Sequence, residues 1–156
     1  MMNEQEEEFI HFVLCIECLH RVWRLINTIK DAQSSSLVGF AFRFALVEYS
    51  KPYNSSRGTF KKKRKLDTSC IPTDLLTLHT RIVNSRDQIH AHSDLTVMDA
   101  KLYISEIQGK RFTTISRNIV TGVEELPNID EIQALIERTL DNMYVKEKVL
   151  ENSLPS

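Results

Sequence analysis

The sequence lacks an excess of charge of either sign. Its 156 residues include 20 Lys and Arg against 21 Asp and Glu, which leaves a formal net charge of −1. No global positive field therefore draws the protein onto nucleic acid, so any attraction to RNA or DNA must be local. The apolar content of 42% and the charged content of 26% are ordinary for a soluble globular protein, and the length predicts one domain, residues 1–156.

Cysteine is also scarce. The count is three, and an odd count without a signal peptide predicts a reducing cytoplasm rather than a disulfide scaffold. Cys15 and Cys18 form a C-x-x-C pair inside a helical apolar pattern. A zinc site would need two further ligands, which His11 or His20 could supply only by crowding one helix. We therefore expect two buried thiols that act as small hydrophobic groups, with no metal or other cofactor.

No apolar run approaches the length needed to cross a membrane. The chain opens on acidic residues that no targeting peptide would carry: Glu4, Glu6, Glu7 and Glu8. We expect a cytoplasmic protein with no membrane partner.

Apolar residues at spacings of three and four predict amphipathic helices in several stretches. One helix is expected over about 3–34 with Asn3 as its cap, a second over about 37–50 ended by Lys51-Pro52, and a last over about 128–151. The expected apolar side of the second helix is Phe40, Phe44, Leu46 and Val47. The stripe of the last helix is expected to include Ile132, Leu135, Ile136, Leu140, Met143 and Val149.

Another helix is expected to open at Pro72-Thr73-Asp74, with the proline near its start and the threonine as its cap. Its expected buried stripe is Leu75, Leu78, Ile82 and Ile89. Further on, the β-rich segments 102–105 and 112–115 flank Gln108-Gly109-Lys110 and predict a small hairpin. The sum is a mainly α fold, a bundle of about four helices with a β-hairpin before the last helix.

Residues 53–72 have no periodicity and predict a flexible basic loop. The loop carries six cations: Arg57, Lys61, Lys62, Lys63, Arg64 and Lys65. Each could contact a phosphate, release counterions and add salt-dependent affinity for nucleic acid. A solvated charge run explains the same residues, so both readings stay open.

The most informative stretch is 83–94, in the helix that opens at Pro72. It sets a cation, two imidazoles and two carboxylates within nine positions: Arg86, Asp87, His90, His92 and Asp94. Arg86 offers a planar charged fork suited to a phosphate, and a histidine exchanges protons near neutral pH. These residue types predict phosphodiester chemistry.

Helix geometry limits which histidine can work with the arginine. At about 100° per residue, Arg86 and His90 lie on one face, whereas His92 lies about 120° away. His92 can join Arg86 only if the helix ends near Ala91, and Ser93-Asp94 favours such an end because both side chains compete for local backbone bonds.

At these residues the sequence resembles the HEPN superfamily (higher eukaryotes and prokaryotes nucleotide-binding). These all-helical domains are marked by an arginine, usually followed by a polar residue, and a histidine four to six positions beyond. Arg86, Asp87 and His92 fit this pattern with five intervening residues. The stretch 91–94 looks like the ending seen in HEPN proteins related to phage abortive infection, and residues 44–53 and the hairpin before the last helix also look like that subgroup.

The resemblance implies a metal-independent endoribonuclease in phage defence or a toxin role, acting as a homodimer whose two motifs line one cleft. His92 would take the proton from a ribose 2′-hydroxyl or give one to the leaving oxygen, and Arg86 would hold the charged phosphorane. The products would be a 2′,3′-cyclic phosphate and a 5′-hydroxyl. Asp87, His90 and Asp94 would play supporting parts.

Asp94 departs from one branch of the family. HEPN toxins paired with a nucleotidyltransferase antitoxin often carry a tyrosine there, so we expect neither adenylylation at this position nor a particular antitoxin. Two alternatives stay open: a non-catalytic nucleotide- or RNA-binding module that uses the basic loop, and a dimerisation module. If Arg86 is purely structural, it forms an ion pair with a carboxylate such as Asp87 or Asp94, or with Glu48 on the second helix. His79 and Arg81 are expected at the surface or in an interface.

Overall fold

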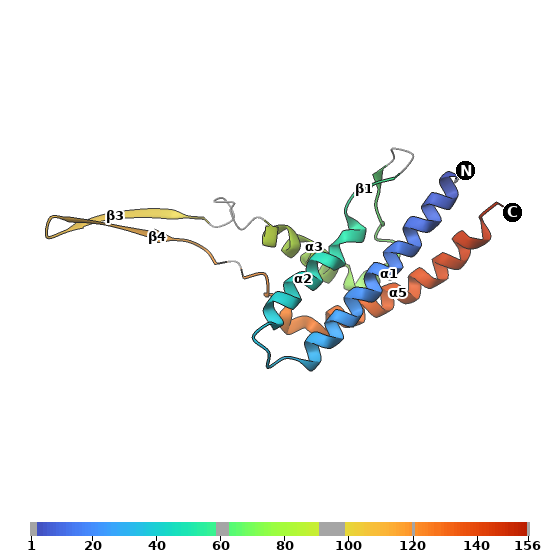
Figure 1. The fold of residues 1–156 in the computed structure, drawn as a ribbon, viewed down its shortest axis with the longest axis horizontal. Coiled ribbons are helices and arrows are strands. Elements are labelled where there is room, and N and C mark those ends of the chain that lie inside the picture. Colours follow the sequence, from blue (N-terminus) through green and yellow to red (C-terminus); the bar gives the residue numbers. More distant parts are fainter. Residues whose placement is uncertain (1–2, 59–62, 91–98, 120, 156) are drawn as a thin grey trace.

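The computed structural model describes residues 3–58, 63–90, 99–119 and 121–155. In this described part of the chain, four α-helices form a bundle and a two-stranded antiparallel hairpin precedes the last helix, as predicted (Figure 1). No helix among the described residues is both long and apolar enough to cross a membrane.

The element boundaries follow the predicted ones closely. The helices are α1 (Glu4–Asp31), α2 (Val38–Ser50), α3 (Leu76–His90) and α5 (Ile129–Asn152). The strands are β1 (Ser56–Arg57), β2 (Lys63–Arg64), β3 (Lys101–Ile107) and β4 (Lys110–Ser116). Short 3-10 turns are η1 (Lys51–Tyr53), η2 (Thr73–Leu75) and η3 (Leu126–Asn128).

The start of α1 is fixed by a capping box. The Asn3 side chain accepts a hydrogen bond from the Glu6 amide at 2.8 Å, and the Glu6 carboxylate accepts one from the Asn3 amide at 2.6 Å. Two of the orphan amides of the first turn are thereby satisfied, and the acidic first turn suits the helix dipole. The predicted Asn3 cap is confirmed.

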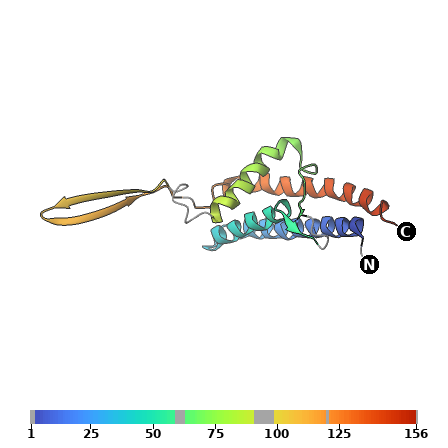
Figure 2. The same ribbon diagram turned by 90° about the horizontal axis from the view of Figure 1, so that it is seen from above.

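α1 lies antiparallel along α5 and also packs on α2, while α3 packs on α2 (Figures 1 and 2). Polar contacts fix the long pair: Trp23 Nε1 donates to Glu137 Oε1 at 2.8 Å, and Lys30 Nζ donates to Gln133 Oε1 at 2.7 Å. The stripe predicted for the last helix is buried except at Val149, which is exposed near its end.

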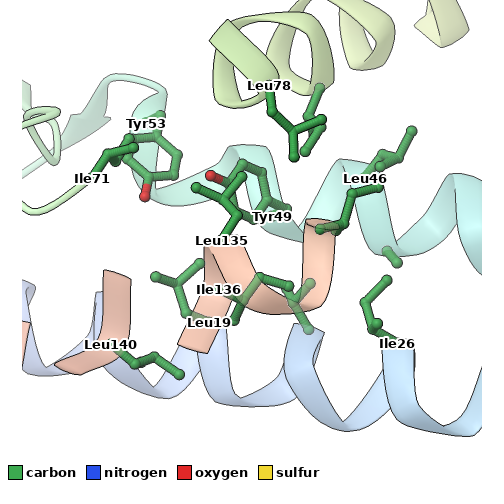
Figure 3. Close-up of a cluster of buried hydrophobic side chains, with 14 of the residues drawn as sticks. Leu19, Ile26, Leu46, Tyr49, Tyr53, Ile71, Leu78, Leu135, Ile136 and Leu140 are labelled. Carbon is green, nitrogen blue, oxygen red and sulfur yellow. The ribbon is translucent and has the colours of Figure 1, made fainter. Parts of the chain in front are cut away.

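One cluster of buried side chains joins all four helices. Figure 3 shows its centre, to which α1, α2, α3 and α5 each contribute; among the labelled residues are Leu19, Ile26, Leu46, Tyr49, Leu78, Leu135 and Ile136. Burying one leucine or isoleucine side chain contributes roughly 1.5–3 kcal/mol, so this cluster is the main source of stability. Cys15 and Cys18 are buried beside it, as expected. Burial, and then Cys18, raises the pKa of Cys15 to about 11.

The apolar side predicted for α2 is confirmed at Leu46 and wrong at Phe40 and Phe44. Phe40 and Phe44 are 64% and 57% exposed. The buried side consists instead of Val38, Phe42, Ala45, Leu46 and Tyr49, together with two polar residues near the end of the helix. Phe40, Phe42 and Phe44 are two positions apart, so they point to different sides of the helix and cannot all be buried. The buried side is the one that packs on α1 and α3.

The predicted Thr73 cap is also wrong. The chain enters helical geometry at Thr73 itself, the first residue of η2, after Pro72 at φ −56° and ψ 135°. A capping residue needs non-helical backbone angles, and Thr73 is already inside the turn. No side-chain cap hydrogen bond forms at this end of η2.

The predicted hairpin is confirmed and extends further than expected. Leu102 faces Ile115 across the strands, and Gln108 and Gly109 form the turn with φ values of 49° and 72°. Positive φ at both central residues defines a type I′ turn, whose twist matches that of the two strands. Lys110, expected in the turn, is the first residue of β4. The hairpin stands clear of the bundle in both views (Figures 1 and 2).

Candidate functional site

Arg86 lies in the last described turn of α3, and its side chain is half-buried. Its Nη1 donates to Asp87 Oδ1 at 2.7 Å. Its Nε is buried and has no hydrogen-bond partner among the described residues. A buried donor left without an acceptor costs roughly 1–3 kcal/mol. An oxygen atom that reached this nitrogen would therefore be bound favourably.

The Arg86–Asp87 ion pair is one of the pairs expected if Arg86 has a purely structural role. Asp87 is 63% exposed, so the pair lies largely in water and contributes at most about 1 kcal/mol to stability. Glu48, the carboxylate of α2 that was also a candidate ion-pair partner of Arg86, pairs with Lys51 instead. The contact with Asp87 thus orients the guanidinium more than it stabilises the fold.

Several predicted site residues have no described side chain: Arg57, Lys61, Lys62, His90, His92 and Asp94. His90 is the last residue of α3, and residues 91–98 lie outside the described part of the chain. The approach of a histidine to Arg86 therefore stays a prediction.

A cavity of about 370 Å³ lies on the α3 face that carries Arg86. His79 and Val83 form one wall of this cavity and precede Arg86 by seven and three positions, which keeps all three on one side of the helix. Residues 65–68 form much of the rest of the wall, including Lys65 from the basic loop. The fold thus brings the end of the basic loop to the helix of the predicted catalytic arginine.

His79 lies in the core, and the predicted surface position is wrong. Its Nδ1 lies 2.9 Å from the Tyr49 hydroxyl, and its ring meets the Tyr53 ring edge-on with 4.5 Å between centroids. Burial, and to a lesser extent Lys65, lowers the pKa of His79 to about 4, so the imidazole is neutral at pH 7. Burial raises the pKa of Tyr49 well above its usual value, so the hydroxyl keeps its proton. His79 acts as a buried hydrogen-bonding group.

The sequence did contain a signal that His79 is buried. Position 79 follows Leu78 directly and precedes Ile82 by three, which places it on the edge of the predicted buried stripe. Its partner Tyr49 comes from another helix, and no local pattern identifies it.

The basic loop separates into exposed and anchored cations. Lys63 and Lys65 are exposed. Arg64, between them, turns toward α1, where its Nε pairs with Glu7 Oε1 at 3.1 Å and its Nη2 donates to the Glu4 carbonyl at 3.3 Å. Successive residues of a strand point to opposite sides, which explains the alternation. Arg64 therefore fastens the loop to α1, with an arginine side chain only 12% exposed.

The exposed lysines share a pocket of about 160 Å³ with Lys146 of α5. The nearby carboxylate of Asp67 is already engaged: it accepts from the Ser69 amide at 2.9 Å and lies 3.4 Å from Lys146 Nζ. The hydrogen bonds from Ser69, with a smaller effect of Lys146, lower the pKa of Asp67. Lys146 was not predicted as a site residue, because no sequence spacing connects α5 with the loop.

No family model, curated protein or solved structure matches this chain. The resemblance to the HEPN superfamily therefore rests on the motif and on the order of the helices. Within the described residues, no group of three or more His, Cys, Asp or Glu side chains is placed to hold a metal ion.

Proposed function

We propose that this chain is a metal-independent endoribonuclease of the HEPN type that acts as a homodimer in the cytoplasm, in phage defence or a toxin role. The observation that carries the proposal is Arg86. Its guanidinium is half-buried near the end of a bundle helix, is held at Nη1 by Asp87, and keeps a buried Nε that lacks an acceptor among the described residues. A phosphate oxygen is the ligand that such a group fits best.

In the proposed reaction, His92 removes the proton of a ribose 2′-hydroxyl, and the 2′-oxygen attacks the adjacent phosphorus. The bond to the 5′-oxygen breaks, and that oxygen leaves with a proton. Arg86 stabilises the charge of the phosphorane. One histidine cannot be base and acid in the same step, so two copies of His92 across a two-fold axis divide the roles. The products are a 2′,3′-cyclic phosphate and a 5′-hydroxyl.

The RNA strand would lie over the basic loop. Lys63 and Lys65 are exposed, and Lys146 lies beside them. Lys146 is already paired with the Asp67 carboxylate at 3.4 Å, so it should add little to the slope. Two phosphate contacts on a single strand, from Lys63 and Lys65, give a slope of roughly −1.4 for log affinity against log salt, so affinity should fall roughly sevenfold between 50 and 200 mM salt. Arg64 should contribute little to this slope, because Glu7 already neutralises it.

The same lysines favour the alternative function, a non-catalytic RNA- or nucleotide-binding module. They converge from the loop and α5 without any part for Arg86. This alternative expects salt-sensitive retention of RNA that Lys63→Ala with Lys65→Ala abolishes and that His92→Ala leaves unchanged.

The deciding experiment is incubation of total RNA with the purified chain in excess EDTA, followed by analysis of the new ends. Cleavage should leave cyclic phosphate ends, and it should fall roughly 10²–10⁴-fold in His92→Ala and Arg86→Ala. Arg86→Lys keeps the charge without the planar fork and should recover little activity. Arg24→Ala, which removes an exposed arginine on α1, is the matched control and should cleave normally.

Two results would count against the ribonuclease. RNA that is retained but never cut would support the binding module instead. Cleavage that persists in both Arg86→Ala and His92→Ala would assign the activity to a contaminant or to other residues.

A further inference from the structure

The hairpin β3–β4 forms an arm, residues 101–116, whose side chains are all exposed. In both views it points away from the bundle, and its strands pack mainly on each other (Figures 1 and 2). Six large apolar side chains of the arm are between 47% and 66% exposed: Leu102, Tyr103, Ile104, Ile107, Phe112 and Ile115. A two-stranded hairpin in water is marginally stable unless one face is covered. The arm therefore needs a partner surface.

The two faces of the arm differ in chemistry. Residues opposite each other across an antiparallel pair share a face. One face is aliphatic, with Leu102, Ile104 and Ile115, and its only charges are Glu106 and Arg111, which stand opposite each other. The other face carries the two aromatic residues, Ile107 and two lysines, Lys101 and Lys110.

The aliphatic face identifies the class of partner. Single-stranded RNA is bound by cations and by aromatic rings on which bases stack. RNA on the aromatic face would leave Leu102, Ile104 and Ile115 in water. An apolar protein surface would cover them, so a protein is the partner class that fits this face.

The chain itself carries a matching surface on α2. Leu37, Phe40 and Phe44 are spaced by three and four, so they form one line along the helix, here named the α2 stripe. All three are more than half exposed, and Arg43 lies over the Phe40 ring at 4.8 Å from its centroid. α2 begins at the end of the bundle from which the arm leaves (Figures 1 and 2).

We propose that two copies of this chain pair by exchanging arms, with the aliphatic face of each arm lying across the α2 stripe of the other copy. Both surfaces are on one chain, so the contact is made twice about a two-fold axis and closes at two copies. The dimensions agree, because the stripe from Leu37 to Phe44 rises roughly 10 Å along α2, and Leu102 to Ile104 span roughly 7 Å along β3.

The buried area is also sufficient. Large apolar side chains that are about half exposed bury roughly 100 Å² each, so three on the arm and three on the stripe give roughly 600 Å² per contact. Two symmetric contacts give roughly 1,200 Å², the lower limit for a stable interface. Arm exchange gives a geometry to the homodimer of the proposed function, and the biological role of this dimer rests on that function. The evidence and the test for arm exchange involve no RNA, so arm exchange and the ribonuclease function can fail separately.

The test is the mass of the full chain in solution, measured by sedimentation equilibrium over a series of concentrations. The wild type should be a dimer. Leu102→Thr with Ile115→Thr places β-branched threonine at both strand positions. Phe44→Lys changes an exposed position of α2. Each variant should raise the dissociation constant at least tenfold, because each contact loses roughly one or two buried side chains. Tyr103→Thr, on the other face of the arm, is the matched control and should pair normally. Circular dichroism checks that each variant keeps its helices.

Mixing the two variants gives the sharper result. Neither variant alone has an intact arm–stripe contact, but a mixed pair has one, formed by the arm of Phe44→Lys on the stripe of the double threonine variant. Mixed dimers should therefore appear at concentrations where each variant alone is monomeric. A monomeric wild type, or variants that do not complement each other, would overturn the proposal. A double threonine variant that stays dimeric but no longer retains RNA would show that the arm binds RNA instead.

Discussion

Acidification should destabilise this fold through His79. The histidine has a pKa of about 4 in the folded chain, against 6.5 for an exposed one, because burial and Lys65 disfavour its charged form. Between these two values the unfolded chain binds a proton that the folded chain does not, so stability rises with pH in this window. The loss amounts to roughly 2 kcal/mol at pH 5 and roughly 3 kcal/mol below pH 4.

The groups around His79 shape this window. Tyr49 bonds to its Nδ1, Tyr53 meets its ring, and Lys65 and Asp67 lie on the wall of the same cavity. Both tyrosines stay protonated in acid, so neither changes state as the pH falls to 4. The Ser69 hydrogen bonds hold the pKa of Asp67 below its usual value, which keeps this carboxylate ionised over most of the window.

The assay is urea unfolding of the wild type and of His79→Gln between about pH 7.5 and pH 4.5. At neutral pH the variant should be less stable by roughly 1 kcal/mol, because Tyr49 loses its partner. It lacks the titrating imidazole, so the difference should close near pH 6 and reverse below it, leaving the variant more stable by roughly 1 kcal/mol at pH 5. Parallel curves for His79→Gln and the wild type, or an imidazole that titrates near 6.5 by NMR, would refute the assignment.

Two further predictions concern the attachment of α3 and of the basic loop. Ile82 is fully buried where α3 meets α2, so Ile82→Ala should cost roughly 3 kcal/mol and lower the midpoint of thermal unfolding by roughly 6–12 °C. Val145 is exposed, so Val145→Ala should change neither the free energy of unfolding nor the thermal midpoint. An equal loss of stability in Ile82→Ala and Val145→Ala would contradict the placement of the core. Glu7→Gln leaves Arg64 without its charge partner in a site where both side chains are at most 12% exposed, so it should cost roughly 3 kcal/mol. Glu17→Gln, at an exposed position of the same helix, is the control for Glu7→Gln in the same thermal melts. If both variants lost equally little stability, Arg64 would lie in solvent rather than in a buried ion pair.

Local patterns predicted the elements of this fold well. The start of α1 follows from its cap, the extents of α1 and α5 follow from apolar spacing, and the hairpin follows from β-rich segments around Gln108-Gly109. These signals involve residues only a few positions apart. The Arg86–Asp87 pair could be anticipated for the same reason.

The errors arose where distant elements decide the outcome. α2 has apolar residues on several sides, and only its contacts with α1 and α3 determine that Phe42 is buried and Phe40 exposed. The partners of His79 and Arg64 lie 30 and 57 positions away in the sequence. No periodicity in one segment carries that information, which is why the cavity beside Arg86 and the anchoring of the basic loop emerge only from the folded chain.

The pairing of α1 with α5 has a consequence for how the chain folds during synthesis. α1 is made before α5 and packs along it, and about 100 residues separate the end of α1 from the start of α5. At ordinary rates of translation these residues take roughly 5–20 s to make, and throughout that time the side of α1 that carries Leu19 and Ile26 has no α5 to cover it. Nascent chains should therefore depend on chaperones, and chains that stop before α5 should aggregate rather than accumulate as folded fragments.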